Sequence, residues 1–383
     1  MSSIINEFLK RSAQHIARKR NLLFVLGNEA GDMDTVVGSI YLAMYLEKTN
    51  TFGVDCCIPV LNFEKEDLPL RQDVVKLFSR HGISTEHLRT IKGQVGATGF
   101  IDLKQLNFSV VLYDHNKLPP DQCFLMESVV GIIDHHVDEG LYVEQTARLR
   151  RIEKTGSACT LVTELFQEGG LEIPCPDLLL APIVVDTVNL DPSQKRVTER
   201  DIAATKSLVT QSNYNDYITT LFKDLMAWKQ DIHGLTVPQH LRRDYKGFEF
   251  PFKNNGENVL RVGISSVACR FDELLSDHDV GTFASSCIDF IETRTIDALL
   301  LVFAGEREPG SYCRQLAFFA KDDALRALLT FCKRPTDGVE FKAIETKSIG
   351  GWVLAAYELS DPSVSRKRLV PSLGNFLLSW NSL

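Results

Sequence analysis

Acidic and histidine side chains follow several apolar runs of this chain, and they are side chains of the types that hold metal ions. The apolar run 129–133 is followed directly by Asp134, His135 and His136, and another apolar run ends at Asp114. If these runs are parallel strands, their carboxyl ends meet at one edge of a sheet, where open α/β sheets bind ligands. The pattern therefore predicts a metal centre at that edge.

Three further carboxylates extend this set. Asp32 and Asp34 lie two residues apart after the apolar run 22–26, where a turn can direct both side chains into one pocket, one for each of two metals. Asp186 follows the apolar run 178–185, which we expect to be mainly helical. Each also has an ordinary interpretation, as a helix cap or a solvated loop residue. Their recurrence after apolar runs favours metal binding.

The two adjacent histidines are expected to have different roles. His135 and His136 are adjacent, so we expect their side chains to diverge, with one binding metal and the other contacting a substrate oxygen. Asp134 is placed to orient an imidazole through its Nδ1 hydrogen. His115 and Asn116 could hydrogen-bond the metal ligands from outside the coordination sphere, or contact the substrate. The alternative is a set of satisfied polar residues at strand ends.

This combination of side chains suits phosphoryl transfer to water. Two divalent ions about 3.5–4 Å apart can share one hydroxide as nucleophile and neutralise the charge that builds on phosphoryl oxygens. Oxygen ligands favour Mg²⁺ or Mn²⁺, and imidazole shifts the preference toward Mn²⁺, Co²⁺ or Zn²⁺. The prediction is a hydrolase that uses two divalent metal ions.

Basic side chains far along the chain could bind the phosphates. Arg366 and Lys367 lie near the C-terminus, and Lys246 precedes a predicted strand. Arginine can grip phosphate with two hydrogen bonds, although a solvated helix start is the ordinary interpretation. Weaker candidates are Arg71, Lys76 and the run Arg148, Arg150, Arg151 and Lys154. This last run precedes a predicted helix start that could hold an anion, but it is equally typical of a surface strand.

Length and patterning predict two α/β domains. The chain has 383 residues, of which 44% are hydrophobic, enough for two cores. Alternating strand-like and helix-like segments predict a mostly parallel, doubly wound catalytic domain over residues 1–195. A linker or helix over 196–214 would lead to a smaller α/β domain over 215–383, which clamps the substrate across a cleft.

Charge and cysteine content narrow the classes of protein. The net charge of −8 argues against a nucleic-acid partner, and no apolar run approaches the roughly 20 residues of a membrane helix. Nine cysteines without a CxxC pair predict reduced thiols. We expect the basic residues 1–20 to form a folded helix rather than a transit peptide, and the protein to be cytosolic and monomeric.

In their order along the chain, these motifs resemble the DHH phosphoesterase superfamily, in the branch that holds exopolyphosphatases, family II inorganic pyrophosphatases and prune-like proteins. The N-terminal half carries the four acidic motifs in the expected order. The C-terminal half carries Asp-x-Lys-x-Phe at 244–248 and Ser-Arg-Lys at 365–367. The resemblance covers nearly the whole chain.

The resemblance implies a role for each candidate. Asp32 would bind the first metal, Asp34 the second, and Asp114 both, while His135 and Asp186 would complete the second site. The residues expected to contact phosphate are His136, Lys246, Arg366 and Lys367.

One position departs from part of the family. The pyrophosphatases of this branch begin their first motif with Gly-His, whereas this chain has Gly27-Asn28, as in the exopolyphosphatase and prune-like members. A neutral oxygen at Asn28, if it reaches metal or substrate, should tilt the first site toward Mg²⁺. Residues 62–73 also resemble the exopolyphosphatases.

The expected function is therefore metal-dependent release of terminal phosphate from linear inorganic polyphosphate, with Mg²⁺ preferred and Mn²⁺ or Co²⁺ as alternatives. An inorganic pyrophosphatase or a nucleoside-polyphosphate phosphatase of the same family is one alternative. A prune-like interaction protein with vestigial catalysis is another, but every expected carboxylate is present.

Overall fold

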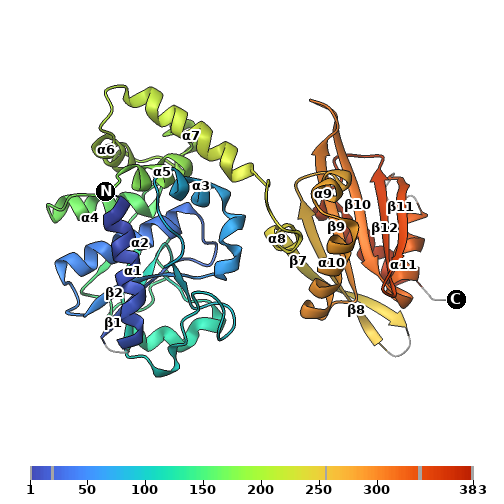
Figure 1. The fold of residues 1–383 in the computed structure, drawn as a ribbon, viewed down its shortest axis with the longest axis horizontal. Helices are drawn as coiled ribbons and strands as arrows, with labels where there is room; N and C mark the ends of the chain where they lie inside the picture. The colour runs from blue at the N-terminus through green and yellow to red at the C-terminus, as the bar shows by residue number, and fades with distance from the viewer. Residues whose placement is uncertain (1, 19–20, 255–256, 335–338, 381–383) are drawn as a thin grey trace. The chain divides into compact units, whose positions relative to one another are not determined.

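The chain forms two compact units, Met1–Asp231 and Ile232–Leu383. The computed structural model describes residues 2–18, 21–254, 257–334 and 339–380 (Figure 1). The division falls later than the boundary expected near residue 215. The helix α7 (Tyr214–Gln230) packs on α3 (Gln72–Arg80) and α5 (Asp177–Asp186), which belong to the first unit.

The first unit is built on a six-stranded sheet with the order β3-β2-β1-β4-β5-β6, in which every pairing is parallel. Its strands are β1 (Leu22–Leu26), β2 (Cys56–Leu61), β3 (Arg89–Thr90), β4 (Phe108–Tyr113), β5 (Val129–Asp134) and β6 (Arg150–Ile152). Chain order reverses between β1 and β4, so the crevice beyond their carboxyl ends is where a doubly wound sheet binds its ligand. The predicted doubly wound fold is confirmed.

Both faces of this sheet are covered, which explains why its strands are apolar throughout rather than alternating. Leu23 and Val25 of β1 face the core shared with the helices, whereas Leu22, Phe24 and Leu26 face a second core lined by short 3-10 segments and loops. The helices are α1 (Ser2–His15), α2 (Met33–Thr49), α3, α4 (Ala158–Glu168), α5, α6 (Glu199–Leu208) and α7. Of the basic start, residues 2–15 are helical as expected, and residues 1 and 19–20 lie outside the described part.

The second unit has a mixed six-stranded sheet with the order β11-β12-β10-β9-β8-β7. Only β8 and β9 pair in parallel among these neighbours. The strands are β7 (Tyr245–Asn254), β8 (Glu257–Val267), β9 (Ala298–Glu306), β10 (Tyr312–Ala320), β11 (Phe341–Ile349) and β12 (Trp352–Leu359). The helices are α8 (Val237–Arg243), α9 (Phe271–Asp277), α10 (Val280–Arg294), α11 (Asp322–Cys332) and α12 (Arg366–Ser379).

Alternate residues of β10 serve the two faces of this sheet. Leu316 and Phe318 pack into the core that includes α11 and α12, whereas Ala317 and Phe319 pack into the core that includes α9 and α10. The predicted second α/β domain is thus confirmed. No helix in the described part of the chain is long and apolar enough to cross a membrane.

Candidate metal centre

One pocket of about 470 Å³ in the first unit gathers the side chains that the sequence singled out. They come from the segments that follow β1, β4 and β5 and from the C-terminal end of α5. The predicted site residues that line it are Asn28, Asp32, Asp34, Asp114, His135, His136 and Asp186.

Asp34 is held at the bottom of the site by the start of a neighbouring helix. Its two carboxylate oxygens accept hydrogen bonds from the backbone N–H groups of Ala158 (2.7 Å) and Cys159 (2.8 Å) at the start of α4. Helix N-termini stabilise negative charge. The anion expected at this helix start is therefore the chain's own Asp34, so these two amides already have their acceptor.

Asp114 leaves β4 in a left-handed conformation, with φ of 63°. Aspartate is one of the few residues besides glycine that adopt this conformation readily. The Asp114 carboxylate accepts a hydrogen bond from Thr35 Oγ1 at 2.5 Å. Asn28 donates through Nδ2 to the Asp114 carbonyl (3.0 Å) and accepts through Oδ1 from Ala30 N (3.0 Å), so it braces the two motif loops.

Both histidines lie beside Asp114. His135 Nε2 is 3.3 Å and His136 Nδ1 is 3.8 Å from Asp114 Oδ1, and the two ring centroids are 4.5 Å apart. One ligand atom from each of Asp114, His135 and His136 can lie within 4.8 Å of the others, a group that could hold a metal ion. The side chains therefore converge on Asp114 rather than diverging as expected, because both stem from the end of β5 next to the end of β4.

A relay of hydrogen bonds orients His136. Its Nδ1 lies 2.8 Å from Asp134 Oδ1, as the sequence predicted, and the other oxygen of Asp134 accepts from Asn116 Nδ2 at 2.5 Å. The hydrogen bond that His136 donates to Asp134 raises the pKa of His136, although partial burial opposes it. His115 instead hydrogen-bonds the carbonyl of Tyr113 (2.9 Å), and it does not line the pocket.

Asp186 reaches the pocket from a helix rather than from a strand. It is the last residue of α5, and its Oδ2 is buried without a hydrogen-bond partner in the described residues. The chain then turns through three successive left-handed residues, Val188, Asn189 and Leu190. Each such residue costs roughly 1–2 kcal/mol. The fold therefore tolerates strain beside an unsatisfied carboxylate.

The electrostatics of this cluster show an excess of negative charge. Burial and the charges of Asp34 and Asp32 raise the pKa of Asp114 to about 7, against the opposing hydrogen bond from His135. Burial and the same two carboxylates raise the pKa of Asp186 well above its usual range. Although burial opposes it, the hydrogen bond with Asp114 and the charge of Asp34 raise the pKa of His135 to about 10.

These features fit divalent cations. Carboxylates whose pKa values are raised by burial and by one another, beside an imidazole whose pKa is also raised, mark a site that favours additional positive charge. The orphaned oxygen of Asp186 supplies an unused ligand atom, and the oxygen and nitrogen donors match Mg²⁺ and Mn²⁺ chemistry. Asp32, Asp34, Asp114, His135, His136 and Asp186 are the residues that could hold such ions.

Three basic residues line the same pocket, and two of them were absent from the sequence prediction. They are Lys154, Lys195 and Arg196. Lys154 belonged to a weak candidate run, whereas Lys195 and Arg196 lie in a polar stretch that looked like a linker. No local pattern marks them, because only the fold brings residues 154 and 195–196 to one rim.

Other basic candidates have structural partners. Arg150 pairs with Asp138 at 2.6 Å, and Arg151 pairs with Glu168 at 3.0 Å. Arg71 donates to the carbonyls of residues 30 and 31 and so supports the loop that carries Asp32. Lys76 pairs with Asp231. These contacts give the side chains a role in holding the fold.

The basic candidates of the second unit lie at the start of β7 and of α12. Arg366 donates to the carbonyl (2.6 Å) and to Oδ1 (2.6 Å) of Asp244, so the helix start is tied to the strand start. Lys246 and Lys367 are exposed.

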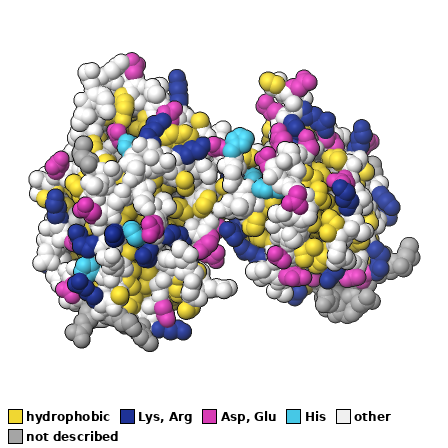
Figure 2. Space-filling model, viewed as in Figure 1, with side chains coloured by type: hydrophobic (Ala, Val, Ile, Leu, Met, Phe, Trp, Pro, Cys, Tyr) yellow, Lys and Arg dark blue, Asp and Glu magenta, His cyan; other side chains and the backbone are white. Residues whose placement is uncertain are grey.

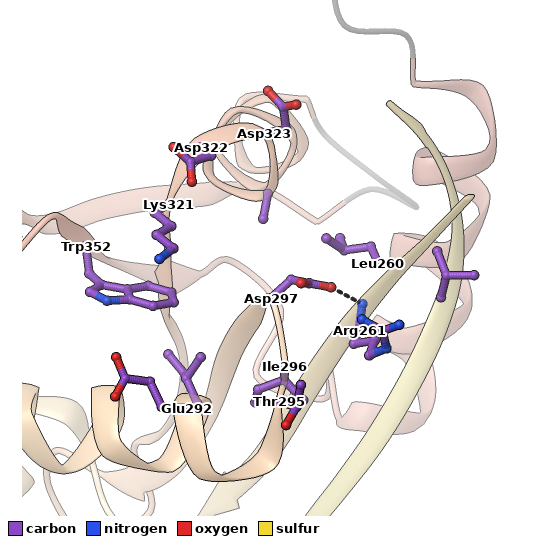
Figure 3. Close-up of a pocket in the computed structure, with 13 residues that line it drawn as sticks. Leu260, Arg261, Glu292, Thr295, Ile296, Asp297, Lys321, Asp322, Asp323 and Trp352 are labelled. Atoms are coloured by element: carbon purple, nitrogen blue, oxygen red, sulfur yellow. Dashed lines mark hydrogen bonds between the residues drawn. The ribbon is translucent and has the colours of Figure 1, made fainter. Parts of the chain in front are cut away.

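The second unit also has a pocket, of about 570 Å³, which the sequence did not predict. Lys321 Nζ lies 4.6 Å from the centre of the Trp352 ring, and Asp297 accepts from the backbone N–H of Arg261 at 2.7 Å (Figure 3). Asp323 pairs with Arg326. Two of the four carboxylates that line it, Asp297 and Asp323, thus have partners of their own. On the visible face of the molecule, basic and acidic side chains are interspersed over both units (Figure 2).

Comparison with known proteins agrees with this geometry. The model of the DHH family N-terminal domain matches residues 23–184, and the model of the DHHA2 domain matches residues 223–376. Exopolyphosphatase PRUNE1 of Mus musculus is 30% identical over 386 residues, covering 98% of this chain and 80% of that protein. The human PRUNE1 is 28% identical over 382 residues, covering 98% of this chain and 80% of that protein.

A bacterial relative carries the other named activity of this group. A "probable manganese-dependent inorganic pyrophosphatase" of Streptococcus pyogenes is 25% identical over 251 residues, which is 64% of this chain and 72% of that protein. The two matched domains correspond to the two units, and the acidic pocket lies in the first. The chain belongs to the DHH phosphoesterase family and carries a DHHA2 domain as its second unit.

Proposed function

We propose that this protein is a metal-dependent exopolyphosphatase, which releases the terminal phosphate of linear inorganic polyphosphate. The observation that carries the proposal is the convergence of Asp32, Asp34, Asp114, His135 and Asp186 on one pocket, in which burial and neighbouring carboxylates raise the pKa values of Asp114 and Asp186. The names of the relatives that align over nearly the whole chain favour polyphosphate as the substrate.

The chain's own residues divide the work. Asp32 and Asp34 would each hold one ion, Asp114 would hold both, and His135 and Asp186 would complete the second site. Divalent ions bound there would neutralise phosphoryl charge and lower the pKa of the attacking water.

His136 would contact the phosphate that is cleaved. Because its Nδ1 is engaged by Asp134, its Nε2 is the atom that can donate to a phosphoryl oxygen. Lys246, Arg366 and Lys367 of the second unit would bind the phosphates of the departing chain. Arg366 is pre-oriented by Asp244, and that contact would have to be shared or exchanged when phosphate binds.

The test is an assay of the full chain with linear polyphosphates of defined length and Mg²⁺. We expect one inorganic phosphate per cleavage and a chain that shortens by one unit at a time. Cuts inside a long chain, or removal of its terminal units as pyrophosphate instead of phosphate, would contradict the proposal, whereas the pyrophosphate left when a chain has been shortened to two units is expected. A parallel assay with Mn²⁺ and Co²⁺ tests the proposed preference for Mg²⁺.

An inorganic pyrophosphatase is the second candidate, because a relative over part of the chain is named as one. Asn28 disfavours it, since the pyrophosphatases of this branch carry histidine there. Comparing kcat/KM for pyrophosphate and tripolyphosphate separates the two activities, and a strong preference for pyrophosphate with Mn²⁺ would favour the second. A nucleoside tetraphosphate in the same assay tests capped substrates.

We also propose a cellular compartment and an oligomeric state for the protein. All nine cysteines are unpaired, which supports a reducing, cytosolic environment. We expect a monomer, with polyphosphate rather than nucleic acid or membrane as its partner. Size-exclusion chromatography with light scattering tests the monomer, and a mass of twice the chain would contradict it.

A further inference from the structure

Three cations on the rim of the acidic pocket have no acidic partner in the described part of the chain. They are Lys154, Lys195 and Arg196, and each lines the pocket that holds the metal candidates. None of their side chains makes an ion pair, a hydrogen bond or a ring contact among the described residues. All three are exposed to solvent. Positive charge is therefore available at the mouth of a site expected to receive phosphate.

Neighbouring basic residues, unlike the three on the rim, have acidic partners. Arg150, Arg151 and Arg200 come from the same segments of the chain, and all three form ion pairs. Arg151 and Arg200 both contact Glu164. Acidic residues thus pair with these three arginines, which do not line the pocket, whereas the cations on its rim have no acidic partner among the described residues.

A buried carboxylate holds the two rim segments together. Asp201 is fully buried and accepts hydrogen bonds from Gly156 N (2.9 Å), Thr160 Oγ1 (2.6 Å) and Thr198 N (2.7 Å). It therefore ties the segment after Lys154 to the segment after Arg196. A buried, fully bonded carboxylate of this kind fixes the geometry of what it connects.

Gly156 shows how closely the segments approach. A Cβ atom at this position would lie 2.8 Å from the carbonyl oxygen of Arg196 and 2.4 Å from Thr187 Cγ2, so no side chain fits. Lys195 itself is in a left-handed conformation, which closes the 3-10 turn Pro192–Gln194. The rim cations are thus mounted on a fixed backbone, and less ordering is needed when an anion binds.

We propose that Lys154, Lys195 and Arg196 form a phosphate-binding rim within the first unit, which takes the non-scissile phosphates of a phosphoanhydride chain. The inference rests on the proposed function, because it assumes that phosphate is cleaved at the adjacent carboxylates. The rim contributes binding that is the same in the ground state and the transition state. Its loss therefore raises KM and leaves kcat nearly unchanged.

The test compares the full chain with a variant that carries Lys154→Ala, Lys195→Ala and Arg196→Ala. The matched control carries Lys10→Ala, Lys206→Ala and Lys223→Ala, which removes the same charge from exposed positions of the first unit that do not line the pocket. We expect KM for tripolyphosphate to rise by about 10–100-fold in the rim variant, with kcat within about threefold of the wild type. The control should change KM by less than about twofold.

Direct binding separates this inference from the proposed activity. The dissociation constant for tripolyphosphate is measured with Mg²⁺ in the Asp114→Asn background, with and without the rim substitutions, so the result does not depend on turnover. If the rim substitutions raise the dissociation constant for tripolyphosphate, the result supports the phosphate-binding rim even if the wild-type protein releases a product other than inorganic phosphate. A variant with Lys154→Arg and Lys195→Arg keeps the positive charge, and a dissociation constant close to that without rim substitutions would also support the rim.

Two results would overturn the rim. One is an unchanged KM and an unchanged dissociation constant for tripolyphosphate. The other is tighter Mg²⁺ binding in the rim variant without any change in tripolyphosphate binding, since the cations would then only balance the charge of the carboxylates.

Discussion

The pocket of the first unit and the pocket of the second unit are both lined by carboxylates, but they differ in how these carboxylates are compensated. In the first, burial and the charges of Asp34 and Asp32 raise the pKa values of both Asp114 and Asp186. In the second, Asp297 accepts a backbone amide and Asp323 pairs with Arg326. Repulsion among closely placed carboxylates, rather than the number of acidic residues, marks the place where cations are expected.

Among the substitutions that test this difference between the two pockets, replacing Asp114 should have the largest effect on activity. Asp114→Asn should lower kcat by more than about 100-fold, because one residue is proposed to hold both ions and its loss should exceed that of an outer hydrogen bond. The melting temperature should not fall, since the substitution removes repulsion while an amide oxygen can still accept from Thr35. Activity at the wild-type level would remove Asp114 from the centre. The control is Asp138→Asn, because Asp138 is an exposed carboxylate that lies close to the same motif in the sequence.

The relay behind His136 should have the next largest effect. Asp134→Asn should lower kcat/KM or metal affinity by about 10–100-fold, because Asp134 fixes the orientation of the imidazole. Kinetics with Mg²⁺ titration would separate the two contributions. Normal kinetics and normal metal affinity in a folded variant would show that the relay is structural.

The acidic pocket should also make metal binding depend on pH. In the metal-free protein, the pKa of Asp114 is raised from 3.8 to about 7, and that of His135 from 6.5 to about 10. The folded state therefore binds more protons than the unfolded state between about pH 4 and about pH 10, and the free energy of unfolding should fall as pH rises through this window.

Divalent ions compete with these protons, so each displaced proton should raise Mg²⁺ affinity by up to about tenfold per pH unit below the pKa of its group, and the affinity should continue to rise more gently above about pH 7. Calorimetric Mg²⁺ titrations at several pH values, with denaturant unfolding in EDTA, provide the measurements. An affinity for Mg²⁺ that does not change with pH would contradict a centre built on Asp114.

The pocket of the second unit should give the smallest effect. Lys321→Ala removes a cation that lies over Trp352, but it should change kcat/KM for tripolyphosphate by less than about twofold, because this pocket is not proposed to bind substrate. A loss comparable to that of the rim variant would show that the comparison between the two pockets is mistaken. The same assay with the rim variant provides the reference value.

Much of the first sheet could be predicted because its strands are short apolar runs bounded by turns. The strands β1, β4 and β5 lie where apolar residues predicted them, and the ligand candidates follow directly. In contrast, β11 was missed, since this edge strand is mostly exposed and carries Lys342, Glu345 and Lys347 instead of an apolar pattern. Asp186 follows an apolar run that was expected to be mainly helical, and the helix α5 delivers it.

The identities of the candidate ligands and their order after apolar runs were determined by sequence, because parallel strands place their carboxyl ends at one edge. Which cations remain available was decided only by tertiary structure. Arg150 and Lys154 look alike in the sequence, but the fold gives Arg150 a carboxylate partner and leaves Lys154 at the pocket. Charge pairing depends on residues far apart in the chain, and no local pattern encodes it.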